Sequence, residues 1–99
     1  MSTGAGNNTF TIAADHPSLP RHFPGAPIVP GVVILEQVLA MIETRGPTGA
    51  LRLPQVKFLR PLLPGERAQV DIVEADPRRW RFRVLRDGVL LASGEVVAG

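Results

Sequence analysis

The chain of 99 residues contains no cysteine, which excludes disulfide bonds and thiolate metal sites. It contains only two histidines, too few for a histidine-based metal centre, so we expect no metal. The formal net charge is +2, well short of the excess typical of proteins that bind nucleic acid. No apolar run approaches the roughly 18 residues needed to cross a membrane. The first ten residues lack the basic and apolar regions of a signal peptide, so a cytoplasmic protein is expected.

Hydrophobic residues, by contrast, are plentiful and make up 44% of the chain. A protein of this length forms one domain and buries only about 60–70% of its unfolded surface when it folds alone. The apolar content therefore indicates that some surface is buried against another copy. We expect residues 1–8 to be a flexible N-terminus and residues 9–99 to be a single domain.

Residues 16–36 read HPSLPRHFPGAPIVPGVVILE and carry both histidines and five of the ten prolines. A helix is predicted over 31–44, because Pro30 suits a first helical turn and Gly46-Pro47 ends the pattern. Its apolar residues cover nearly the whole circumference, which is typical of a helix buried on all sides. One carboxylate, Glu36, interrupts this apolar run.

The other segments are predicted to be strands, at 9–14, 51–59, 68–75, 79–86 and 89–97, of which the second is interrupted or begun at Pro54. The fourth strand alternates cleanly, with aromatic and aliphatic residues on one face and Arg79, Arg81 and Arg83 on the other. Asp87-Gly88 is a strong signal for a two-residue hairpin. The simplest arrangement is an α+β fold in which a curved, mostly antiparallel sheet of about five strands wraps one buried central helix.

The segment that leads into the helix carries HFPG at 22–25 and Pro27, and it is followed by PGV at 30–32 and by Glu36 within the helix. This pattern resembles the HFPxxPxxPGV signature of 3-hydroxyacyl-ACP dehydratases of the hot-dog fold, where an acidic residue lies fourteen positions after the histidine, as Glu36 does after His22. Residues 56–61 and 64–66 resemble the KFxxPxxPGD strand and turn of the same family. The resemblance covers roughly residues 10–98 and implies a hot-dog fold.

The sequence departs from the housekeeping members of that family in three ways. Arg21 stands where a glycine usually precedes the histidine, the EAxAQ sequence of those enzymes is replaced by EQVLA at 36–40, and the chain is short. The segment DHPSLPRHFPGAPIVPGV at 15–32 is similar to short variants associated with secondary pathways such as aryl polyene synthesis. These departures bear on the substrate more than on the reaction.

The resemblance implies a lyase that removes water from a 3-hydroxyacyl thioester to give the trans-2-enoyl thioester. The acyl group is carried on the phosphopantetheine of acyl carrier protein, so no further cofactor is expected. His22 suits the base that takes the α-proton, since imidazole titrates near neutral pH. Burial in an apolar helix would keep Glu36 protonated and able to donate to the departing hydroxyl. The backbone N–H of Gly31, at the helix N-terminus, would stabilise charge on the thioester oxygen.

Family members place the histidine and the acidic residue of one site on different subunits, with an acyl tunnel at the interface. The resemblance therefore implies a homodimer or a higher oligomer, with acyl carrier protein as partner. The expected substrate contacts are Phe23, Pro30, Val32, Val33 and Phe58. A glycine at position 31 would let the thioester approach the helix closely.

Several alternatives stay open at this point. The chain could be a hot-dog thioesterase, or a non-catalytic module that binds acyl carrier protein or pairs with a related subunit. Isomerisation of the product is a possible second activity, and the acyl chain is undetermined. A packing role is favoured for His16, and an ordered loop is favoured over a PxxP ligand. The face with Arg79, Arg81 and Arg83 is either solvated or directed at acyl carrier protein, with nucleic acid a poor third.

Overall fold

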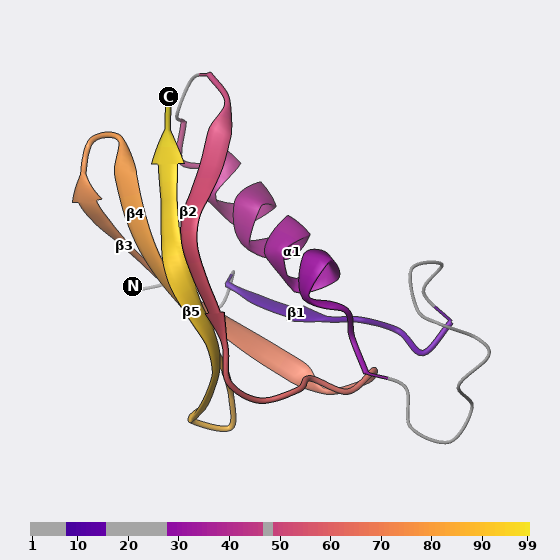
Figure 1. Ribbon diagram of the computed structural model, residues 1–99. Coiled ribbons are helices and arrows are strands. Elements are labelled where there is room, and N and C mark those ends of the chain that lie inside the picture. The colour runs from indigo at the N-terminus through magenta and orange to yellow at the C-terminus, as the bar shows by residue number, and fades with distance from the viewer. Residues whose placement is uncertain (1–7, 16–27, 47–48) are drawn as a thin grey trace, which may run out of the picture.

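The computed structural model describes residues 8–15, 28–46 and 49–99. Its elements are β1 (Thr9–Thr11), α1 (Gly31–Glu43), β2 (Leu51–Phe58), β3 (Arg67–Asp76), β4 (Arg79–Arg86) and β5 (Val89–Ala98). The strands form one sheet in the order β1-β3-β4-β5-β2, and every neighbouring pair is antiparallel. Figure 1 shows α1 lying along one face of this curved sheet. The predicted hot-dog architecture is confirmed, while most of the predicted flexible N-terminus lies outside the described residues.

The alternation predicted for β4 is confirmed. Trp80, Phe82 and Val84 are buried among the core residues, whereas the arginines between them are exposed. The ring of Phe82 fits because its cross-strand neighbour is Gly94. A Cβ at Gly94 would come within 2.9 Å of that ring and closer still to the backbone carbonyl of Gln55. The inner face of the sheet is therefore packed tightly at this point.

The turn between β4 and β5 follows the predicted chemistry. Asp87 and Gly88 both have positive φ, 51° and 81°, which two-residue hairpin turns of type I′ require. In the preceding turn, the backbone N–H of Arg78 donates to Oδ1 of Asp76 at 2.9 Å. These local contacts align β3, β4 and β5 as a continuous antiparallel meander.

The strand β2 lies at one edge of the sheet and contains Pro54. It runs unbroken from Leu51 to Phe58, but its pairing with β5 shifts register between Arg52 and Gln55. Proline has no N–H for a ladder, so it is tolerated at an edge or at such an irregularity. The interruption predicted near Pro54 is thus a change of register within one strand.

The helix α1 differs from the prediction in its burial. Its buried residues are Val33, Ile34, Val38 and Ile42, which face the sheet as part of the core. Its exposed residues are Val32, Glu36, Ala40 and Glu43, which recur at helical spacing. Burial on all sides is therefore wrong for a single chain, because one sheet can cover only one side of a helix.

Candidate active site at the start of the helix

The first turn of α1 has no side-chain cap. Pro30 is the N-cap residue, with φ −60° and ψ 145°, and no side chain hydrogen-bonds to the turn. The Pro30 carbonyl accepts from the N–H of Val33 at 3.0 Å and from that of Ile34 at 3.4 Å. Within the described residues, the N–H groups of Gly31 and Val32 have no hydrogen-bond acceptor. These two donors lie at the end of the helix where partial positive charge accumulates.

Gly31 lies directly against the ring of Phe58. A Cβ at position 31 would stand 2.7 Å from Cζ of Phe58 and 3.1 Å from each neighbouring Cε, well inside van der Waals contact. The structure thus gives a reason for this glycine besides the predicted approach of a thioester, because any side chain here would displace Phe58. Gly31 and Phe58, both predicted from the sequence as site residues, are 27 positions apart in the chain, and the fold brings them into contact.

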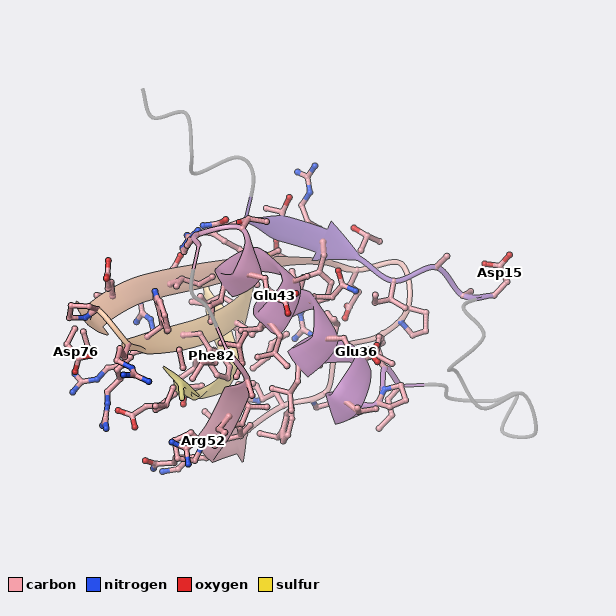
Figure 2. The ribbon with its side chains drawn as sticks, turned by 90° about the horizontal axis from the view of Figure 1, so that it is seen from above. Asp15, Glu36, Glu43, Arg52, Asp76 and Phe82 are labelled. Atoms are coloured by element: carbon pink, nitrogen blue, oxygen red, sulfur yellow. The ribbon has the colours of Figure 1, made fainter. Side chains whose placement is uncertain are left out.

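Glu36 lies on the exposed face of α1, one turn after Val32. Figure 2 shows it on the helix, with Glu43 further along and Phe82 on the sheet. At a rise of about 1.5 Å per residue, Glu36 is about 7.5 Å along the helix from Gly31. The predicted burial of Glu36 is corrected: within one chain the carboxylate is in solvent, so only a second surface could exclude water from it.

Large apolar side chains are exposed around this end of the helix. We call the following residues the helix-start patch, with their exposed fractions: Ile28 49%, Val32 62%, Phe58 50%, Leu59 50% and Leu63 42%. They come from the segment that enters α1, from the first turn of α1, and from the end of β2 with the loop after it. Large exposed apolar side chains on segments that meet at one place can form a ligand-binding or protein-binding surface.

The other predicted site residues fall in different places. His22 and Phe23 lie outside the described residues. Pro30 is half-buried at the helix start. Val33 has no exposed surface in the single chain and belongs to the hydrophobic core. The sequence reasoning missed Ile28, Leu59 and Leu63, which no periodic pattern distinguishes from core residues.

The outer face of the sheet is separate from this site. It carries a shallow groove of about 790 Å³, lined by side chains that include Gln69, Asp71 and Ser93. Arg79 and Arg81 lie 3.5 and 3.6 Å from Glu95, and Arg83 lies 3.1 Å from Asp71. The paired charges are consistent with a solvated strand face.

Neither a metal cluster nor a membrane-spanning helix occurs in the part of the chain that the structure describes. There, no three histidine, cysteine, aspartate or glutamate side chains gather in a way that could hold a metal ion. Over the same residues, no helix has both the length and the apolarity to span a membrane.

Comparison with known proteins identifies the family. The model of the ApeI-like family, described as ApeI dehydratase, matches residues 4–95. The chain belongs to the ApeI-like dehydratase family. Other relatives are named 3-hydroxyacyl-[acyl-carrier-protein] dehydratase FabZ. The protein from Anaeromyxobacter sp. is 30% identical over 89% of this chain and 63% of its own length, and that from Myxococcus xanthus is 32% identical over 88% and 67%. This family member thus spans about two thirds of the length of these curated relatives.

Solved structures give the same fold. The dehydratase heterocomplex ApeI:P from Xenorhabdus doucetiae matches with a TM-score of 0.74 at 24% identity, over 90% of this chain and 81% of the other. A mutant of the phenylacetic acid degradation protein PaaI from Thermus thermophilus matches with a TM-score of 0.58 at 26% identity, over 92% and 82%. A 1,4-dihydroxy-2-naphthoyl-CoA thioesterase from Synechocystis matches with a TM-score of 0.53 at 19% identity, over 89% and 75%. The fold is therefore shared by dehydratases and thioesterases, and does not by itself select the reaction.

Proposed function

We propose that this protein dehydrates a 3-hydroxyacyl thioester carried on acyl carrier protein. The observation that carries the proposal is the arrangement at the start of α1 in a chain that matches a dehydratase family over residues 4–95. There, the backbone N–H of Gly31 has no acceptor among the described residues, Glu36 lies on the next exposed turn, and Phe58 of the helix-start patch lies against Gly31.

The proposed reaction divides the work among three groups. His22 removes the α-proton, and the electron pair of that bond forms the Cα–Cβ double bond as the Cβ–O bond breaks. Glu36 donates a proton to the departing hydroxyl, which leaves as water. The N–H of Gly31 stabilises the negative charge that develops on the thioester oxygen, a contribution that oriented backbone donors make without reorganisation. The proton on His22 later returns to Glu36 through solvent, so the enzyme is regenerated.

A second copy of the chain is proposed to complete the site. Glu36 and Val32 are exposed in one chain, whereas a carboxylic acid that stays protonated near neutral pH needs a surrounding from which water is excluded. A partner that covers the exposed face of α1 would bury the helix-start patch and supply that surrounding. The apolar acyl chain would then lie between the copies, against Phe58 and Val32.

The test measures enoyl formation from a panel of aliphatic and aryl 3-hydroxyacyl thioesters on acyl carrier protein. The wild-type chain is compared with His22→Ala and Glu36→Gln, and with Glu43→Gln as a matched control on the same exposed helix face. Loss of at least about a hundredfold is expected for the first two, the scale of a general acid or base. Little change is expected for the control.

The same assay decides the alternatives. Release of the free acid would assign a thioesterase, a reaction that the shared fold also supports. Turnover that requires a second, related subunit would assign a heteromeric enzyme, the kind of assembly that the Xenorhabdus heterocomplex is named for. A folded wild-type chain that produces no enoyl thioester under any of these conditions would reject the proposal.

A further inference from the structure

The loop at residues 59–66, between β2 and β3, ties the start of α1 to the rest of the sheet. At one end, the N–H groups of Leu59 and Arg60 both donate to the carbonyl of Leu91, at 2.7 and 3.2 Å. At the other end, the N–H of Gly65 donates to the carbonyl of Ile12 at 2.8 Å. The loop is thus anchored to β5 and to the segment that follows β1.

The middle of this loop holds the residues that lead into the helix. The N–H of Val29 donates to the carbonyl of Leu62 at 2.8 Å, and both side chains are buried. Pro30 has no N–H, so this bond is the last backbone donation before the helical turn that begins with Gly31. The position of Leu62 therefore sets the position of Val29, two residues before the unpaired donor of the site.

The side chains of Glu66 and Arg86 form hydrogen bonds with the backbone of the residues on both sides of Leu62. Oε1 of Glu66 accepts from the N–H of Leu63 at 2.9 Å and from Nη1 of Arg86 at 3.0 Å. The same Nη1 donates to the carbonyl of Pro61 at 3.1 Å. Arg86 belongs to β4, so the pair connects the loop to the β4–β5 hairpin. Its side chain is 25% exposed, against 46–70% for the arginines of the other three ion pairs among the described residues.

We propose that Glu66 and Arg86 are positioning residues for the site at the start of α1, holding Leu62 so that Val29 and the N–H of Gly31 stay in place. The catalytic part of this inference rests on the proposed function. The alternative role is a general stabilising ion pair, but exposed pairs usually contribute little stability. The difference lies in the backbone contacts at Pro61 and Leu63, which a simple surface pair would not make.

The first measurement needs no enzymatic activity. Amide hydrogen exchange of Val29 is followed by NMR in the full chain, with the N–H of Val70, bonded to the carbonyl of Asn8 at 2.7 Å, as the internal reference. In Glu66→Ala, exchange at Val29 is expected to accelerate at least about tenfold relative to Val70, because the loop opens locally. The matched control is Asp71→Ala, which breaks the 3.1 Å pair with Arg83 on the outer sheet face and should leave Val29 unchanged.

The second measurement separates positioning from stability. Arg86→Met should lower kcat by at least about tenfold with KM within about threefold, because a displaced donor weakens the transition state more than substrate binding. Arg86→Lys, which keeps a donor on a similar stem, should recover part of kcat. If Glu66→Ala fails to fold, both the amide exchange at Val29 and the kinetics are measured on Arg86→Met and Arg86→Lys.

Three results would overturn the inference. Unchanged exchange at Val29 would mean that the loop is held without the pair. Equal acceleration at Val29 and Val70 would mean a general loss of stability. Faster exchange at Val29 with unchanged kcat in an active enzyme would mean that the loop does not position the site. A wild-type chain that has no dehydratase activity would instead reject the proposed function, while the exchange result would still decide whether the pair holds the loop.

Discussion

At its C-terminal end, α1 is closed by the residues that directly follow it, whereas its N-terminal end is held by a loop from another part of the chain. Oγ1 of Thr44 donates to the carbonyl of Met41 at 2.6 Å. The N–H groups of Thr44, Arg45 and Gly46 donate to carbonyls in the last turn of the helix, and Gly46 has φ 97°, a common way to end a helix.

Among the described residues, the N-terminal end shows no equivalent local closure. There, the N–H of Val29 donates to the carbonyl of Leu62, 33 positions away in the chain, and the segments that meet at this end expose the helix-start patch. The surface at the other end carries exposed Glu43, Thr44 and Arg45. The C-terminal end of a helix presents carbonyl groups, and here the residues that follow α1 cap several of them. The N-terminal end presents N–H groups, and those of Gly31 and Val32 have no acceptor among the described residues, so this is the end whose backbone donors could meet a negatively charged group.

The largest effect is expected when the contact between Gly31 and Phe58 is broken. Gly31→Ala places a methyl group 2.7 Å from Cζ of Phe58, so the half-exposed ring must move and the site is distorted. Dehydratase kcat/KM should fall by about a hundredfold, the scale of a small misplacement in an active site. Steady-state kinetics measure this, and thermal unfolding should show only a small change.

The double variant Gly31→Ala/Phe58→Leu tests the cause of that loss. The smaller side chain leaves room for the added methyl group, so part of the activity should return. A double variant that is no more active than Gly31→Ala would show that displacement of Phe58 is not the cause.

A large effect on assembly is expected at Val32. Val32→Lys places a charge in the helix-start patch and should convert the proposed dimer to a monomer, because an unpaired charge is costly to bury in an interface. Sedimentation velocity measures the change. Val73→Lys is the matched control, since Val73 is 63% exposed on the outer sheet face and Val32 is 62% exposed. A monomeric wild-type protein, or equal effects of both substitutions, would contradict the prediction.

A smaller effect, confined to stability, is expected at the other end of the helix. Gly46→Ala forces a side chain into a left-handed backbone conformation, at a cost of about 1 kcal/mol in the free energy of unfolding. Urea denaturation measures this, and Gly46→Asn should cost less because asparagine tolerates that conformation. Because this end lies outside the proposed site, kcat should be unchanged, and a fall in kcat in the folded variant would count against the comparison.

The smallest effect is expected on stability at acidic pH, and it should arise from Glu66, near the N-terminal end of α1. The hydrogen bond from the N–H of Leu63 is the main cause that holds the pKa of Glu66 below its ordinary value of 4.5; burial opposes it, and the hydrogen bond and charge of Arg86 lower the pKa further. A carboxylate whose folded-state pKa is lowered contributes stability that is complete above its unfolded pKa and is lost as the pH falls through the folded value. The midpoint temperature of thermal unfolding should therefore fall more steeply with decreasing pH, below about pH 4.5, in the wild type than in Glu66→Gln. If the midpoint temperatures of the two proteins changed with pH in the same way, the prediction would be contradicted. The C-terminal end of α1 should not contribute to this pH dependence, because its hydroxyl and backbone contacts at Thr44 and Gly46 do not titrate in this range.

Much of the fold could be read from local patterns. The alternation in β4, the Asp87-Gly88 turn and the limits of α1 each depend on residues a few positions apart, and the structure agrees with them to within a few residues. Pro54 signalled an irregularity in β2, but only the pairing with β5 showed that the strand continues through it. The motif around Gly31 and Glu36 indicated the site because its spacing resembles that of a known family.

The contacts that shape the site could not be read in this way. Phe58 over Gly31, Leu62 beside Val29 and Arg86 against Glu66 join residues that are 20 or more positions apart. The exposure of Glu36 was also hidden, since an apolar helix looks the same whether its second side is covered by its own sheet or by another molecule. By itself, the sequence determined which segments form helix and strand and which residues resemble a dehydratase motif, because those properties follow from short-range geometry and side-chain type. Only the tertiary structure decided which helix face is open and which distant loop holds the helix start, because burial and hydrogen bonding between remote segments exist only once α1 has packed against the sheet.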